Sequence, residues 1–211
     1  MSQPTAQSET DATLPDERTN DAHLKTIHSW WRDLHGHPAG AIDGAATAGE
    51  AAQSTRTRRS PNRRGDRAEL ARCRTPGDVA FTPAFHRLRQ QLVQGREWRG
   101  LSDEMLAVLA AVLAHVRADD RSTEAHGRPS FAAQLASGEG KARMSGLRFR
   151  RLLAVSTPED AMARLIDAVR LCDGKASVES LARDVPWLLH RDERTKKAWA
   201  LAYYSTASTE S

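Results

Sequence analysis

The chain of 211 residues lacks long hydrophobic runs and has only two cysteines. No segment approaches the roughly 18 consecutive apolar residues of a membrane span, so we expect a soluble protein. The polar, acidic segment 1–20 has no apolar core of a signal peptide. Cys73 and Cys172 have no metal-ligand spacing, so we expect reduced thiols and a cytoplasmic location.

Motifs of catalysis are also missing. The chain has no P-loop, no dinucleotide-binding glycine motif after a strand, no GxSxG elbow and no HExxH helix. His35 and His37 form the one close histidine pair, without two further ligands nearby. The adjacent carboxylates Asp119 and Asp120 are more typical of solvated side chains than of a metal clamp. We therefore predict no enzyme, no cofactor and no metal.

The positive charge is unevenly distributed. The net charge is +4, but segment 1–22 holds five acidic residues against one arginine, which leaves about +8 on the rest. Most of the cations are arginines, and a guanidinium binds phosphate through two parallel hydrogen bonds where lysine cannot. This composition favours a nucleic-acid partner.

Apolar residues recur at helical spacing along most of the chain, and no stretch alternates with period two over the length of a strand. The segment from Met105 to Val116 is apolar nearly all round, which predicts a helix at the centre of the core. Trp30 and Trp31 lie on or beside an apolar stripe and are predicted core residues. We predict an all-α fold, a compact bundle of about seven to nine helices, with two helical lobes as an alternative.

Composition divides the chain into four parts. Segment 1–22 is rich in Ser, Thr, Asp and Pro and is predicted to be a disordered acidic N-terminus. A helical domain is expected over 23–204. Within it, the Gly-, Ala-, Ser- and Thr-rich stretch 36–61 is predicted to be a flexible loop. Segment 205–211 is predicted to be a loose C-terminal tail.

One arginine cluster coincides with a predicted helix after Ser145. The stretch Lys141–Leu153 contains five cations and no acid. At 100° per residue, Phe149 and the two following leucines face the core, whereas Arg150 and Arg151 face outward with Arg148 on the flank. Ser145 is the predicted N-cap. Leu147 falls among the arginines, so we expect a second element to cover it.

A second arginine cluster lies between Arg56 and Arg74. From Arg64 onward its residues favour a helix, on which Arg63, Arg67 and Arg74 fall within about 40° of one another. Leu70 shares that stripe, so arginine stems are expected to cover it while the guanidiniums reach solvent. Arg72 points nearly opposite.

The order and spacing of several motifs resemble the CasB family, the small subunit of the type I-E CRISPR surveillance complex, Cascade. The resemblance extends from His23 to Tyr204. The stretch 36–61 and the acidic N-terminal segment look like additions to the family pattern. The motifs are Trp30–Leu34, Arg64–Arg72 with Arg74, Phe85–Leu88, Met144–Leu153, the capped helix from Thr157, and Val185–Leu189 before a last basic helix.

The resemblance implies an all-helical, non-enzymatic, RNA- and DNA-binding subunit of an antiviral ribonucleoprotein. Two copies would sit head to tail and contact the repeated backbone subunits and the large subunit. They would lie beside the crRNA and hold both the target strand and the displaced non-target strand, which stabilises the R-loop. The phosphate-facing role would fall on Arg64, Arg67, Arg72, Arg148, Arg150 and Arg151.

Two other functions remain open from the residues. A stand-alone helical regulator of duplex DNA would need a recognition helix, and the segment after Gly174 is the candidate, although Trp187–Leu189 is too apolar for that role. A protein–protein adaptor would use the same arginines to meet acidic partners.

Overall fold

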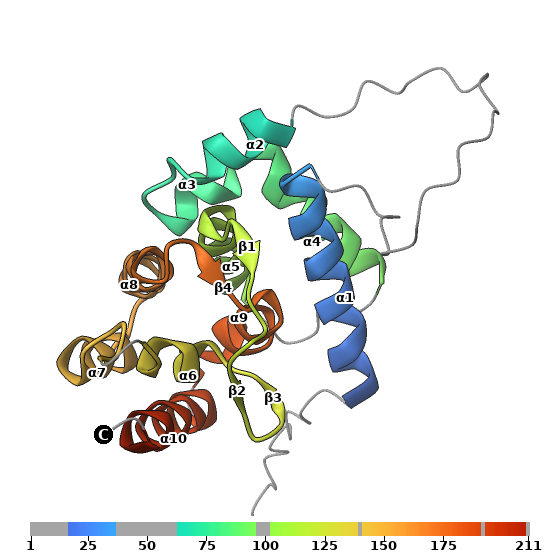
Figure 1. Cartoon of the computed structure of the whole chain (residues 1–211). Helices are drawn as coiled ribbons and strands as arrows, with labels where there is room; N and C mark the ends of the chain where they lie inside the picture. The colour runs from blue at the N-terminus through green and yellow to red at the C-terminus, as the bar shows by residue number, and fades with distance from the viewer. Residues whose placement is uncertain (1–16, 37–62, 96–101, 139–140, 191–192, 210–211) are drawn as a thin grey trace, which may run out of the picture.

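The centre of the fold is α5, Asp103–His115, whose side chains are buried without a break from Met105 to Ala114. The computed structural model describes residues 17–36, 63–95, 102–138, 141–190 and 193–209 (Figure 1). Helices α2, α3, α8 and α9 all pack against α5. The prediction of a central apolar helix is confirmed, because a helix that is apolar on every face needs neighbours on every face.

The remaining elements follow in chain order. The helices are α1 (Glu17–Leu34), α2 (Arg63–Leu70), α3 (Pro76–Ala80), α4 (Pro83–Gln94), α6 (Phe131–Ala136), α7 (Gly146–Leu153), α8 (Pro158–Leu171), α9 (Val178–Asp184) and α10 (Arg194–Thr209), with a 3₁₀ turn η1 at Val185–Trp187. Four two-residue strands, β1 (Ala118–Asp119), β2 (Glu124–Ala125), β3 (Arg128–Pro129) and β4 (Lys175–Ala176), complete the described part.

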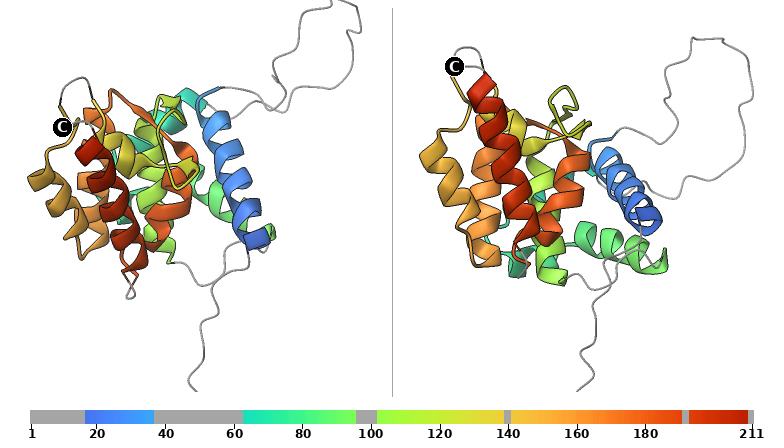
Figure 2. Two further views of the ribbon diagram at one scale, coloured as in Figure 1. Left: turned by 60° about the horizontal axis from the view of Figure 1, so that its bottom comes forward. Right: turned by 90° about the horizontal axis from the view of Figure 1, so that it is seen from below.

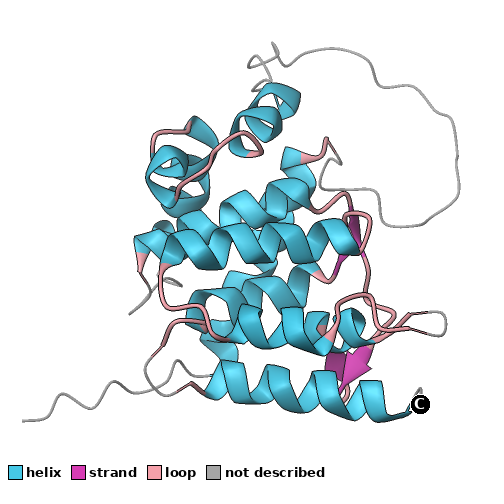
Figure 3. Cartoon of the chain, turned by 90° about the vertical axis from the view of Figure 1, so that its left-hand side faces the viewer, coloured by secondary structure: helices cyan, strands magenta, loops and turns pink. Residues whose placement is uncertain are grey.

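The all-α prediction is confirmed, but the helix count was too low. Ten α-helices lie within the described residues, and their buried apolar side chains form one continuous cluster rather than two lobes. The count exceeds the upper end of the predicted range by one, and α3 and α6 are each only one or two turns long. Figure 3 shows how small the share of strand is beside that of helix.

Capping residues mark the start of several helices. Thr75, Thr82 and Thr157 each accept a hydrogen bond from a first-turn N–H, and each precedes a proline at the first helical position. Ser102 and Ser177 cap α5 and α9 in the same way. These caps fix where the helices begin.

Three predicted boundaries are wrong. The first helix begins at Glu17, so the predicted disordered segment extends too far, and α10 continues to Thr209 into the predicted tail. Apolar periodicity detects only the turns that carry buried side chains, and polar turns escape it. The second cluster's helix ends at Leu70, so Arg74 is not on it. Residues 1–16 and the predicted loop over 37–61 lie outside the described residues.

Three of the short strands, β1, β2 and β3, lie between α5 and α6, and β4 lies between α8 and α9. Strand β1 pairs in parallel with β4, and β2 pairs antiparallel with β3 in a hairpin whose turn contains Gly127 at φ 73°. Two residues cannot show an alternation, which is why the pattern missed them.

The carboxylates of Asp119 and Asp120 are structural rather than solvated. Asp119 accepts a hydrogen bond from the Val178 backbone N–H at 2.9 Å and lies 3.2 Å from His28 Nε2. Asp120 accepts from Gln134 Nε2 at 2.9 Å and from the Ser122 hydroxyl. The pair therefore ties β1 to α1, α6 and α9.

The two tryptophans of α1 are core residues, as predicted. Trp30 Nε1 donates to the Ala84 carbonyl at 3.1 Å and Trp31 Nε1 to the Val116 carbonyl at 3.0 Å, so each buried ring has its polar atom satisfied. These bonds fix α1 against α4 and the end of α5. Figures 1 and 2 place α1 and α4 at one end of the molecule and α7, α8 and α10 at the other.

Truncating the central helix should be costly. We expect Leu109→Ala, at a fully buried position of α5, to lower the free energy of unfolding by about 3 kcal/mol, because it leaves a cavity in a packed core. Urea unfolding followed by circular dichroism measures it. The exposed Leu147→Ala should change stability by less than about 0.5 kcal/mol. Equal losses in both variants would contradict the placement of the core.

Candidate nucleic-acid interface

Helix α7 carries the arginines of the first cluster on a firmly held support. Phe149 stacks on Tyr203 of α10 with ring centroids 3.9 Å apart and planes at 9°. The Tyr203 hydroxyl donates to the Met144 carbonyl just before α7, and Lys196 Nζ donates to the Val155 carbonyl just after it. Helix α10 therefore fixes both ends of α7, which leaves its outer face steady under the arginines.

The predicted faces of α7 are confirmed with two corrections. Phe149 and Leu152 are buried, and Arg148, Arg150 and Arg151 are exposed. No other described element covers Leu147, which is 54% exposed, because it lies directly opposite the buried face. Ser145 occupies the N-cap position, but its hydroxyl accepts no hydrogen bond from the first turn; water can satisfy the N–H groups of an exposed helix end.

A groove between α7 and α8 gathers arginines from both helices. It has a volume of about 490 Å³ and is lined by Arg148 and Arg151 from α7 and by Arg164 and Arg170 from α8. Asp167 is its one acidic lining residue. We call it the α7–α8 groove. Arg164 pairs with Asp160 at 3.0 Å and Arg170 with Asp167 at 3.3 Å, whereas neither α7 arginine has an ion pair within the described residues.

A second basic pocket lies where the C-terminal turns of α2, α5 and α8 meet. It has a volume of about 350 Å³, and Arg67, Arg117 and Arg170 line it together with His115 and Asp173. We call it the His115 pocket. Arg67, His115 and Arg170 each occupy the last turn of their helix, where the helix dipole favours a cation.

Burial and the neighbouring arginines both affect the pKa of His115. Burial lowers the pKa of its imidazole below the usual value, and the guanidiniums of Arg170, Arg67 and Arg117 lower it further. The imidazole is neutral at pH 7.

Arg170 lines both the α7–α8 groove and the His115 pocket, so the two hollows share a wall. Arg67 from the second cluster and Arg148 and Arg151 from the first therefore line adjoining hollows. Arg64, Arg72 and Arg150 are exposed but line neither hollow. Arg150 turns away from α8 because it follows Arg148 by two positions, not three or four.

Sequence reasoning missed Arg117, Arg164, Arg170 and His115. Arg164 and Arg170 lie on the solvent side of α8. Each follows an acid by three or four residues, a spacing that is typical of ordinary surface ion pairs on a helix. Arg117 and His115 stand at the end of the apolar α5. Only the packing of α2 and α8 around that end makes a pocket there, and no spacing in the chain predicts it.

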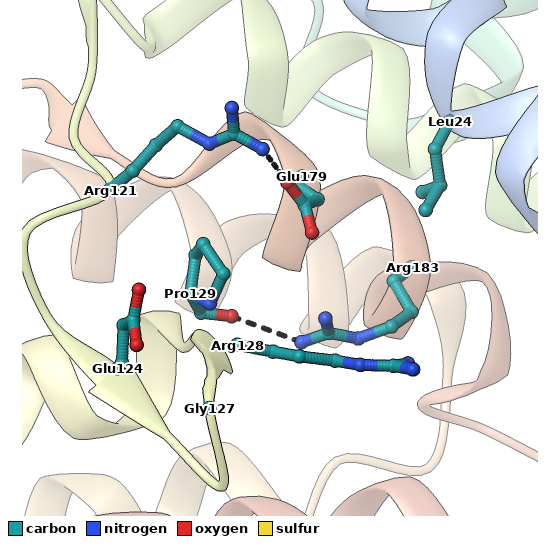
Figure 4. A pocket seen from close by; sticks show the side chains of 8 residues that line it. All are labelled: Leu24, Arg121, Glu124, Gly127, Arg128, Pro129, Glu179 and Arg183. Atoms are coloured by element: carbon teal, nitrogen blue, oxygen red, sulfur yellow. Dashed lines mark hydrogen bonds and ion pairs between the residues drawn. The ribbon is translucent and has the colours of Figure 1, made fainter.

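A third hollow, between α1, α9 and the β2–β3 hairpin, also contains arginines, but carboxylates neutralise two of them (Figure 4). Arg121 pairs with Glu179, and Arg183 donates to Asp184 at 2.9 Å and to the Pro129 carbonyl at 3.1 Å. We call it the hairpin groove. Its arginines mainly join the hairpin to α9.

Among the described residues, no group of three His, Cys, Asp or Glu side chains is placed to hold a metal ion. His37, one member of the histidine pair in the sequence, lies outside them. No helix in the described part is long and apolar enough to span a membrane.

Comparison with protein families gives one match. Residues 66–204 match the family described as CRISPR-associated protein Cse2. Comparison with individual curated proteins gives no match. The matched region contains α7, α8 and both basic hollows, and it begins inside α2 just before Arg67.

The depressed pKa of His115 gives a test of the geometry. Because the pKa in the folded state lies below the unfolded value of about 6.5, the unfolded chain gains the proton first and stability falls as pH drops through that value. The ring is only half-buried, so solvent screening keeps the effect small.

We expect His115→Gln to lose less stability than the wild type when the pH is lowered from about 7 to about 5. Urea unfolding at a series of pH values measures this. His86→Gln, at an exposed position of α4, should keep the wild-type dependence. Parallel curves for the wild type and His115→Gln would show that the arginines do not act on this imidazole.

Proposed function

The chain belongs to the Cse2 family, the CasB family named above, and on that premise we propose that its α7–α8 groove holds DNA phosphates inside Cascade. The family is a non-catalytic subunit of the type I-E CRISPR surveillance complex and works with the other Cascade subunits in antiviral defence. The proposal concerns what this subunit contacts and which residues make the contact.

The observation that carries the proposal is the pair Arg148 and Arg151. The two guanidiniums lie one turn apart on a helix held at both ends, they open onto a groove with Arg164 and Arg170, and they have no ion pair within the described residues. A guanidinium donates two parallel hydrogen bonds to phosphate oxygens in a fixed fork, so this arrangement suits a nucleic-acid backbone. The exposed Arg64, Arg72 and Arg150 would extend the contact.

Contact with the backbone alone is what this role requires. In guide-directed recognition, base pairing between crRNA and target reads the sequence, and the protein holds the strands. Exchange of a DNA duplex for an RNA–DNA hybrid is nearly balanced in free energy, so a few phosphate contacts shift it. We propose that the bound strands are the crRNA-paired target strand and the displaced strand of the R-loop, in the cytoplasm.

Protein partners would meet the exposed apolar residues. Phe81 at the α3–α4 corner is 87% exposed and Leu201 of α10 is 62% exposed, with Tyr204 one turn further along. Large apolar side chains on a surface are typical of protein contacts. We propose that the backbone subunits, the large subunit and a second copy arranged head to tail use such surfaces.

A stand-alone regulator finds no support in the geometry. The segment after Gly174 buries Val178, Leu181, Val185 and Leu188 in the common core, so α9 and η1 have no free face for the major groove. The adaptor hypothesis predicts a different outcome. The chain would bind the other Cascade proteins in the absence of nucleic acid, and its presence would not change how the complex binds DNA.

The first experiment is co-purification of the chain with the other Cascade proteins and crRNA, followed by mobility-shift titration of target duplex with and without it. Entry into the particle with weaker R-loop retention on omission supports the proposal. A chain that stays alone and shifts duplex with sequence preference would favour the regulator.

The site is tested by Arg148→Gln with Arg151→Gln. Removal of two phosphate contacts should weaken retention of target DNA by the complex about tenfold at physiological salt and reduce the slope of log K against log salt by about 1.4. Mobility-shift titrations at several salt concentrations measure both quantities.

The matched control is Lys25→Gln with Arg128→Gln, which removes one charge from the hairpin groove and one from α1 beside it, away from α7. It should leave retention near the wild-type value. If both double variants enter the complex normally and the complexes retain target DNA equally well, the assignment to α7 is wrong. If the arginine variant no longer enters the complex but target DNA is retained normally, the adaptor hypothesis is favoured.

A further inference from the structure

The His115 pocket differs from every surface ion-pair site described above. Its guanidiniums come from three separate segments: Arg67 from α2, Arg170 from α8 and Arg117 from the residue pair that joins α5 to β1. Arg67 and Arg117 have no ion pair within the described residues, and Arg170 has only the exposed Asp167. Three like charges around one hollow repel one another, and a bound anion would relieve that repulsion.

The chain holds Arg117 in place without a carboxylate. Its backbone N–H donates to the Gly174 carbonyl at 2.7 Å, and Gly174 has φ +73°. A Cβ on Gly174 would lie 3.1 Å from Arg117 Cγ and Cδ and 3.2 Å from the His115 carbonyl oxygen. The aliphatic stem of Arg117 therefore lies tightly against the turn after α8, which aims the guanidinium before any ligand arrives.

The size and lining of the pocket indicate its ligand. About 350 Å³ accommodates one phosphate with part of a sugar, and the lining offers cations rather than an apolar floor. Arg170 lines both hollows, so the pocket adjoins the α7–α8 groove. The hairpin groove has three arginines, but two of them, Arg121 and Arg183, already have carboxylate partners.

We infer that the His115 pocket binds one phosphodiester of a nucleic-acid strand against Arg67, Arg117 and Arg170, and that His115 takes up a proton when the pocket fills. The inference rests on the proposed function for the class of ligand. It adds a second binding site and a dependence of binding on pH that the α7–α8 groove does not have.

The proton uptake follows from the groups that face the imidazole. They are Arg67 from α2, Arg170 from α8, and Arg117 and Asp173 from the segments after α5 and α8. The arginines disfavour the imidazolium in the empty pocket, and a phosphodiester reverses the local field. The imidazole makes no hydrogen bond within the described residues, so its ring can bond a phosphate oxygen. By linkage, proton and phosphodiester each strengthen binding of the other.

The test uses the full chain and an oligothymidylate of about six nucleotides, whose phosphodiesters do not titrate near neutral pH. NMR follows the His115 Cε1–H resonance, assigned by its absence in His115→Gln, over about pH 5 to 8 with and without the oligonucleotide. We expect its midpoint to move to higher pH on binding. Affinity should rise about three- to tenfold as pH falls across this range.

Variants separate this pocket from the α7–α8 groove. Arg117→Gln should abolish the midpoint change, and His115→Gln should bind with affinity nearly independent of pH. Arg128→Gln, a single charge removed from the hairpin groove, should keep both properties. Arg148→Gln with Arg151→Gln should bind more weakly yet still move the His115 midpoint at saturation.

Each failure has a distinct meaning. An oligonucleotide that binds without changing the His115 midpoint overturns the pocket and leaves the α7–α8 groove standing. A midpoint change in the isolated chain, with no defect of the Arg148 and Arg151 double variant in Cascade, refutes the proposed function but not the pocket. No binding to the wild-type chain at low salt refutes the pocket directly.

Discussion

The burial of α5 on every face is the constraint on which the rest of the structure depends. A helix without a polar face can be stable only when other elements surround it, and α2, α3, α8 and α9 do so. Two of those neighbours, α2 and α8, reach the end of α5 with their own C-terminal turns. The basic residues that suit helix C-termini therefore meet at one place, so the apolar core determines where the charge gathers.

The basic character of that surface depends as much on where the acids lie as on the number of arginines. Asp66 pairs with Arg87, Asp103 with Arg89, and Asp184 with Arg183, so acids neutralise arginines on α4 and at the hairpin. No described acid pairs with Arg67, Arg117, Arg148 or Arg151. Arginines without an ion pair among the described residues therefore lie on α2, on α7 and just after α5. Screening over about 8 Å at physiological salt keeps this local charge distinct from the rest of the surface.

The fold was more predictable from the sequence than the site. Caps such as Thr82 and Thr157 and the apolar stripes of α5 and α8 are local signals, and each identifies a helix by itself. Helix ends in polar sequence, such as Glu17 and Thr209, carry no such signal. The outward face of α7 was also predictable, because the direction of a side chain depends only on its own helix.

Partners across the interface were not predictable in this way. Periodicity ranks Arg150 with Arg151 as outward residues, but the groove selects Arg148 with Arg151, because α8 packs along that side of α7. His115 ends the most apolar helix of the described residues and Arg117 follows it, so in the sequence both look like ordinary polar residues at a helix end. Their surroundings come from residues more than forty positions away in sequence, so they emerge only from tertiary packing.

Under the proposed function, free energies favour phosphate contacts over base stacking. With a salt slope of about 0.7 per contact, one phosphate contact contributes about 0.8 kcal/mol at physiological salt. Two contacts then equal roughly one DNA base-pair step of about 1.4 kcal/mol. Aromatic stacking contributes about 1–3 kcal/mol per base and requires unpaired bases. Among the described residues, Phe81 is the one phenylalanine or tryptophan that is largely exposed. In the proposed function, arginines on fixed helices would instead add a small increment that is independent of sequence, so a mismatch between guide and target could still prevent the R-loop from forming.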